Sequence, residues 1–176
     1  MTTSNWNILS VFASIISVYI SYLLGKKASN MKFEQKQKMK RYDSLYAPLM
    51  KLLYSRKSND LVFYNLIISN QFESFEKLLI GNVQYMGKES AQLLYKVMTT
   101  GKSEVIKQNK KNLFLINNGM KLQPMDDKAA EAIDLYRDLI IRLLLESVDL
   151  SKSLHLESIG QPLIDIFQKE GKYLDK

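Results

Sequence analysis

The sequence DDKAAEAIDLYRDLIIRLLLE, residues 126–146, predicts the helix around which the folded part of the chain is built. Asp126 and Asp127 suit its first turn, where free backbone amides and the helix dipole favour negative charge. Apolar residues recur at helical spacing along one face: Ile133, Tyr136, Ile140, Leu143 and Leu144. Three more widen that face nearly all round: Leu139, Ile141 and Leu145. We therefore expect a central helix covered on most sides, with Arg142 and Glu146 paired on its surface.

Shorter amphipathic segments on both sides of this helix predict the other layers of an all-α bundle. One upstream stripe has steps of three or four and predicts a single helix that stops at Gly81: Leu61, Tyr64, Ile68, Phe72, Phe75 and Leu79. A further helix begins near Gly87 and is expected to end at Gly101. Near the C-terminus, Pro162 fits the first turn of a last helix.

Residues 101–125 have the least regular pattern. Their apolar run, LFLI over residues 113–116, predicts a short helix, because no partner strand for it is evident elsewhere. Lys107, Lys110 and Lys111 precede it and form either a contact patch or a solvated helix face, and the solvated face is favoured.

The N-terminal stretch WNILSVFASIISVYISYLL, Trp6 to Leu24, contains no charged residue. As a helix, these positions reach roughly 28 Å, about the thickness of the hydrocarbon core of a bilayer. The stretch predicts a single membrane span, which is favoured over a buried helix of a soluble protein. A cleaved signal peptide is the weakest alternative, because the preceding MTTSN carries no positive charge.

Seven basic residues follow this stretch, whereas none precedes it: Lys26, Lys27, Lys32, Lys36, Lys38, Lys40 and Arg41. Basic flanks stay on the cytoplasmic side during membrane insertion. The sequence therefore predicts a single-pass protein of the cell membrane, with its N-terminus outside and its C-terminal domain in the cytoplasm. We expect the seven side chains to lie at the membrane surface and to attract anionic lipids of the inner leaflet.

The location of the charge argues against a nucleic-acid partner. The formal net charge of the chain is +7, but residues 26–41 hold seven basic side chains and one acidic one. The remaining positions are therefore almost neutral, whereas a nucleic-acid groove needs cations spread over the folded domain.

Small residues repeat every three or four positions within the predicted span and share one stripe: Ser10, Ser14, Ser17, Ser21 and Gly25. Small residues let a second helix approach closely in a membrane, so the stripe could join copies of the chain or dock another span. The alternative is that each serine hydroxyl bonds to a carbonyl one turn earlier on its own helix, and this alternative is slightly favoured.

Three parts follow from these patterns: a transmembrane anchor over residues 1–25, a basic juxtamembrane stalk over residues 26–44, and a helical bundle over residues 45–176. Pro48 marks either a kink or the first turn of a new helix at the start of the bundle.

The span, the stalk and the sequence RYDSLYAPL, residues 41–49, together resemble small single-span bacterial and prophage membrane proteins of uncharacterised function. Those proteins carry an R-Y-x-x-L-Y-x-P-L pattern just inside the membrane, and the resemblance covers roughly residues 6–53. Some short prophage proteins of this kind exclude superinfecting phage, which is a function that the resemblance implies at the level of the class. It implies no catalytic residues.

Few side chains offer chemistry. The chain has no cysteine, which excludes disulfides. His155 is its single histidine, which excludes multi-histidine metal sites. Asp134 and Asp138 lie one turn apart and, with Glu131, are best interpreted as an acidic, solvent-facing strip. No catalytic residue, metal or cofactor is predicted.

The sequence thus predicts a membrane-anchored, non-catalytic interaction protein that presents a helical bundle at the inner leaflet to an unknown protein partner. The alternative is a phage or defence-type membrane factor that acts by superinfection exclusion, or by permeabilising the bilayer through oligomerised spans. An enzyme would need a carboxylate-centred site at Asp134 and Asp138.

Overall fold

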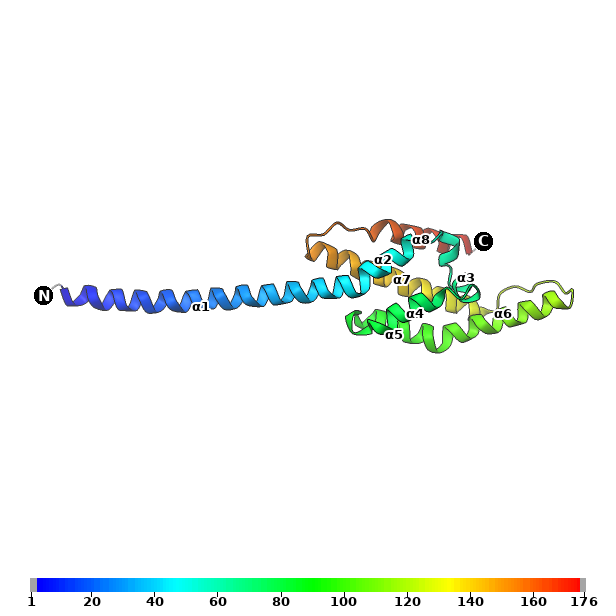
Figure 1. Ribbon diagram of the computed structural model, residues 1–176, viewed down its shortest axis with the longest axis horizontal. Helices are drawn as coiled ribbons and strands as arrows, with labels where there is room; N and C mark the ends of the chain where they lie inside the picture. The colour runs from blue at the N-terminus through cyan, green and yellow to red at the C-terminus, as the bar shows by residue number, and fades with distance from the viewer. Residues whose placement is uncertain (1–2, 175–176) are drawn as a thin grey trace. The chain divides into compact units, whose positions relative to one another are not determined.

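The computed structural model describes the backbone of residues 3–174 and the side chains of residues 17, 19–57 and 60–168. The described residues form helices and connections without strands, so the all-α prediction is confirmed (Figure 1). The helices are α1 (Thr3–Arg41), α2 (Ala47–Tyr54), α3 (Phe63–Ile68), α4 (Phe72–Gly81), α5 (Lys88–Lys96), α6 (Lys102–Asn117), α7 (Asp127–Ser153) and α8 (Gln161–Leu174). Two compact units result, divided between Lys40 and Arg41.

Helix α7 is the centre of the second unit, as the sequence predicts. It packs against α3, α5, α6 and α8 and against the turns that precede α2 and α6. Four neighbouring apolar side chains on it are completely buried: Leu139, Ile140, Leu143 and Leu144. Each contributes about 1.5–3 kcal/mol by leaving water, so this one helix supplies a large share of the apolar burial.

An aromatic cluster fixes the middle of the core. The ring of Phe63 on α3 stacks on that of Tyr136 on α7, with centroids 4.7 Å apart. Phe72 on α4 meets Phe63 edge-on at 5.1 Å. Such pairs add about 0.5–1.5 kcal/mol to the burial of their area, and the cluster joins three helices at one point.

The single helix predicted between Leu61 and Gly81 is wrong, because the chain turns between α3 and α4. Asn70 has a left-handed backbone with φ 55°, a conformation that asparagine tolerates. The amides of Asn70 and Gln71 reach back to the carbonyls of Ile67 and Leu66, at 3.2 and 2.9 Å, which is the pattern of a Schellman cap. The break allows rings on both helices to reach Tyr136.

Gly101 does not end a helix, in contrast to the prediction. The chain continues from α5 through the π-helical turn Val97–Gly101 into α6. Gly101 is buried, and a Cβ atom there would lie 3.5 Å from Ala132 Cβ and 3.6 Å from Phe63 Cε1. These are ordinary contact distances, so an alanine would fit at this position, which lies inside a continuous helical segment beside α7 and α3. Downstream, the run over residues 113–116 is helical, as expected, and lies in α6.

Pro48 lies in the first turn of α2, and the π-helical turn Tyr42–Tyr46 connects that helix to α1. Pro162 occupies the first turn of α8. Both positions match the prediction. A proline at the start of α8 loses no backbone hydrogen bond, whereas α2 follows the π-helical turn without leaving helical geometry at Tyr46.

The first unit consists of α1 up to Lys40, and the side chains described in it are exposed. Within the part of the chain that the structure describes, no helix combines the length and the apolar character needed to cross a membrane. Most side chains of the predicted span, Trp6–Leu24, lie outside that described part.

Tyr136 provides a test of the core. Its hydroxyl is buried without a hydrogen-bond partner among the described residues, and burial raises the pKa of this group above its ordinary value. An unpaired buried hydroxyl costs about 1–3 kcal/mol. We expect Tyr136→Phe to keep the ring packing and to increase the free energy of unfolding by about 1 kcal/mol, measured by urea titration of the helical circular dichroism.

Tyr95→Phe on α5 is the control, because Tyr95 is 70% exposed and its substitution should leave stability unchanged. A loss of stability in Tyr136→Phe would show that the hydroxyl contributes a favourable interaction.

Candidate functional site

The carboxylate of Glu146 on α7 gathers polar groups from three other segments. Its Oε2 accepts hydrogen bonds from Tyr46 Oη at 2.6 Å, from the Gly87 amide at 2.9 Å and from Arg41 Nη2 at 3.0 Å. Its Oε1 accepts one from Ser90 Oγ at 2.6 Å. We call Arg41, Tyr46, Gly87, Ser90 and Glu146 the Glu146 clamp.

The clamp caps helix α5 from outside that helix. Gly87 is the N-cap residue of α5 and has no side chain that could accept a bond from the first turn. The carboxylate of Glu146 takes this place and meets the positive end of the helix dipole. A Cβ atom at position 87 would collide with the carboxylate, so glycine is required for its approach.

The clamp also holds the end of α1. The guanidinium of Arg41 donates to the carbonyl of Tyr85 through Nε and to Tyr46 Oη at 2.8 Å through Nη2. Its carbon lies 5.4 Å from the centroid of the Tyr46 ring. The side chain of Arg41 is 35% exposed and that of Glu146 is 16% exposed, so their ion pair is partly shielded from solvent.

The π-helical turn brings the two α1-proximal members of the clamp together. In a regular α-helix, residues five apart point about 140° away from each other. The turn Tyr42–Tyr46 closes with a bond from the Ala47 amide to the Tyr42 carbonyl, which adds one residue per turn. Arg41 and Tyr46 can therefore reach the same carboxylate oxygen.

This cluster was not predicted from the sequence. The predicted pair between Arg142 and Glu146 is wrong, because Arg142 pairs with Glu89 on α5, and Glu146 pairs with Arg41. Helical spacing identifies neighbours on one helix, whereas the clamp joins residues up to 105 positions apart. The available indication was the arginine and the second tyrosine within RYDSLYAPL, whose polar ends stand beside the apolar residues at the start of the bundle.

Six of the seven predicted membrane-surface residues have exposed side chains on α1: Lys26, Lys27, Lys32, Lys36, Lys38 and Lys40. Arg41 differs, since it belongs to the clamp. Of the predicted packing stripe, Ser17, Ser21 and Gly25 are exposed in the first unit, whereas the side chains of Ser10 and Ser14 lie outside the described residues. The structure thus brings Arg41 to the domain and leaves the lysines accessible.

The candidate chemical groups stay apart. Asp134 pairs with Arg137 one turn away, at 2.8 Å. His155 is exposed in the connection after α7, where its φ of 56° is left-handed. Among the described side chains, no group of histidine and carboxylate residues could hold a metal ion.

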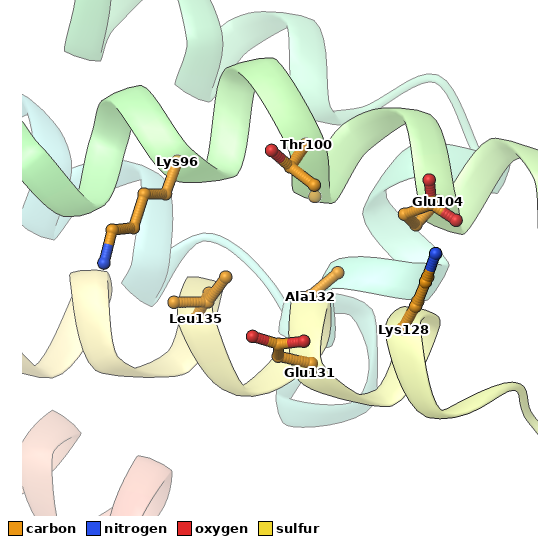
Figure 2. A pocket seen from close by; sticks show the side chains of 8 residues that line it. Lys96, Thr100, Glu104, Lys128, Glu131, Ala132 and Leu135 are labelled. Atoms are coloured by element: carbon orange, nitrogen blue, oxygen red, sulfur yellow. The ribbon is translucent and has the colours of Figure 1, made fainter.

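A cleft of about 410 Å³ lies between α7 and the segment from α5 to α6. Figure 2 shows Lys96, Thr100 and Glu104 on one wall, facing Lys128 and Glu131 on the other. Gly101 and Ala132 form part of its lining. Two lysines balance two glutamates, and Glu104 is already paired with Lys107 at 2.7 Å. This charge arrangement selects neither an anion nor a cation.

Comparisons with known protein families, with curated proteins and with solved structures find nothing that matches this chain.

The clamp makes the free energy of unfolding depend on pH in the alkaline range. Burial, together with the hydrogen bond to Glu146, raises the pKa of Tyr46 well above its ordinary value. Above about pH 10 this tyrosine ionises in the unfolded chain but keeps its proton in the folded one. The unfolded state then binds fewer protons, so the free energy of unfolding falls as the pH rises, by up to about 1.4 kcal/mol per pH unit.

We expect Tyr46→Phe to reduce the slope with which the free energy of unfolding falls above pH 10, by up to about 1.4 kcal/mol per pH unit. The double variant Tyr46→Phe/Tyr136→Phe should reduce this slope about twice as much. Below pH 9, the free energy of unfolding of Tyr46→Phe should be about 1.5–3 kcal/mol lower than that of the wild type, because the charged carboxylate of Glu146 loses a hydrogen-bond donor. Urea titrations at a series of pH values measure both effects. An unchanged alkaline slope in Tyr46→Phe would contradict the burial of this proton.

Proposed function

We propose that this chain is a membrane-tethered, non-catalytic interaction protein. In this proposal Trp6–Leu24 spans the cell membrane with the N-terminus outside, and α2–α8 form a cytoplasmic bundle at the inner leaflet that binds a protein partner. The observation that carries the proposal is the sequence pattern: an uncharged run of bilayer length is followed directly by Gly25-Lys26-Lys27.

The exposed lysines on α1 support a position at the headgroups. If the helix leaves the bilayer along its normal, Lys26 and Lys27 lie within about 5 Å of the end of the span at Leu24, and Lys32 lies about 12 Å from it. The first two lie within the Debye length of about 8 Å in physiological salt, so each gains about 1 kcal/mol from anionic lipid, and Lys32 gains less. Lys36, Lys38 and Lys40 gain less in that orientation and act mainly as a solvated stalk.

The clamp fixes the first residues of the bundle. Arg41 is tied to α7 through Glu146 and to the turn Val83–Tyr85 through the carbonyl of Tyr85.

A second candidate function is a phage or defence-type factor whose spans assemble in the membrane. The feature that favours it is the stripe of small residues through Ser14 and Ser17, which permits close helix approach. Expression of such a factor should lower the membrane potential or alter phage susceptibility, whereas an adaptor should do neither by itself.

The anchoring is tested by fractionation of bacterial cells that express the full chain with a C-terminal tag. We expect the tag in carbonate-washed membranes, and we expect protease added to spheroplasts to leave it intact. The double variant Ile15→Lys/Ile16→Lys should shift most of the protein to the soluble fraction, because each lysine in a span costs about 2.5–3.5 kcal/mol.

The matched control is Ile68→Lys/Ile80→Lys, which places the same substitutions at exposed positions of the domain. This control should remain in the membrane. Full-length wild-type protein in the soluble fraction, or digestion of the tag from outside, would refute the proposed topology.

A further inference from the structure

Large apolar side chains stand exposed at one end of the domain. They lie on the last turns of α6 and on its connection to α7 (Figure 1), and their exposed fractions range from 40% to 61%. We call them the apolar tip: Leu113, Phe114, Ile116, Met120, Leu122 and Met125. Clusters of exposed apolar residues on a soluble surface generally mark a binding or membrane contact.

The apolar tip has a defined shape. Gly119 has a left-handed backbone with φ 66°, and the amide of Met120 bonds to the carbonyl of Leu115 at 2.9 Å. This Schellman cap turns the chain sharply at the end of α6. Leu115 itself is buried, whereas its neighbours Phe114 and Ile116 are exposed.

A polar network holds the two ends of the connection together. Gln108 is buried, and its Oε1 accepts a bond from the Asp126 amide at 3.2 Å. Lys111 Nζ lies 3.1 Å from Asp126 Oδ1, and Asn112 Nδ2 donates to Tyr64 Oη at 3.0 Å. These bonds fix the base of the tip, where α6 and the start of α7 meet.

The charge around the apolar tip is positive. Residues 105–125 contain four lysines and no acidic residue. Lys107 and Lys111 are balanced by Glu104 and Asp126 at the base. Lys110 and Lys121 are exposed and form no ion pair within the described part of the chain, so they complement an anionic surface.

We propose that the apolar tip is a second membrane contact, which inserts its apolar side chains into the interface of a bilayer rich in anionic phospholipid. Apolar side chains beside lysines are typical of segments that bind at this interface, where the lysines meet the phosphates. The irregular outline of a helix end and its connection suits fluid lipid, whereas a protein partner must match it closely. Pairing of two tips is opposed by their like charge.

The bilayer is the one that holds the anchor, so this inference rests on the proposed function. A tethered domain meets its own membrane at a high effective concentration. A contact too weak to recruit a free protein is then sufficient to keep the tip on the lipid.

The chain lacks cysteine, so a single Leu122→Cys substitution allows one environment-sensitive NBD label on the full-length protein. The protein is reconstituted into vesicles of phosphatidylcholine, either alone or with 30% phosphatidylglycerol. We expect the label on outward-facing domains to shift to the blue and to resist dithionite in the anionic vesicles. A label at Tyr95→Cys, on the exposed side of α5, should stay accessible in both.

The charge is tested by Lys110→Gln/Lys121→Gln in the labelled protein. On anionic vesicles this variant should lower the ratio of inserted to accessible label about ten- to thirtyfold. The control Lys88→Gln/Lys152→Gln removes two exposed lysines from other parts of the domain and should keep the ratio of the wild type.

Flotation separates this proposal from that of the anchor. If the protein floats with neutral vesicles, the anchor is supported. If its label at position 122 nevertheless stays accessible on anionic vesicles, the lipid contact is overturned and the tip is left to a protein partner. The proposal is also overturned if the label at position 122 inserts only into separate anionic vesicles added from outside, and not into the membrane that holds the anchor. An equal blue shift of the label at position 95 overturns it as well. If the protein fails to float, the anchor is refuted, and the lipid contact of the tip, which depends on the anchor, is refuted with it.

Discussion

One carboxylate determines how the chain enters its folded domain. Glu146 lies on the central helix α7 and accepts hydrogen bonds from the end of α1, from the turn before α2 and from the start of α5. A half-buried carboxylate is costly unless donors surround it, and four donors surround this one. The first two segments are consecutive in the chain, whereas α5 and α7 are distant from them in sequence, so the carboxylate fixes the start of the bundle against α5 and α7.

The rest of the bundle follows from how closely the other helices can approach α7. Gly101 and Ala132 are both buried and lie beside each other, so small residues line the contact between the α5–α6 segment and α7. The break at Asn70 lets Phe63 and Phe72 converge on Tyr136 from two short helices. The exposed apolar tip lies on the part of α6 that extends beyond this packing, which is why its side chains remain available for another surface.

The sequence predicted what depends on local periodicity and failed where tertiary contacts decide. Helix α7 and the proline-led starts of α2 and α8 were predicted because a 3.6-residue apolar repeat and proline geometry act within one segment. Gly101 was misjudged because a glycine that ends a helix and one inside a continuous helical segment look alike in sequence. The clamp was missed because Arg41 and Glu146 are paired by the fold and by a π-helical turn that periodicity does not reveal.

The double-mutant cycle of Arg41→Gln and Glu146→Gln tests the central claim most directly, because it isolates the interaction between the end of α1 and α7. The full chain is unfolded with urea in detergent and followed by the helical circular dichroism, together with both single variants and the double variant. The partly shielded pair should give a coupling free energy of about 1 kcal/mol. Effects that add to within about 0.3 kcal/mol would contradict the pair of Arg41 and Glu146 as a stabilising contact of the clamp.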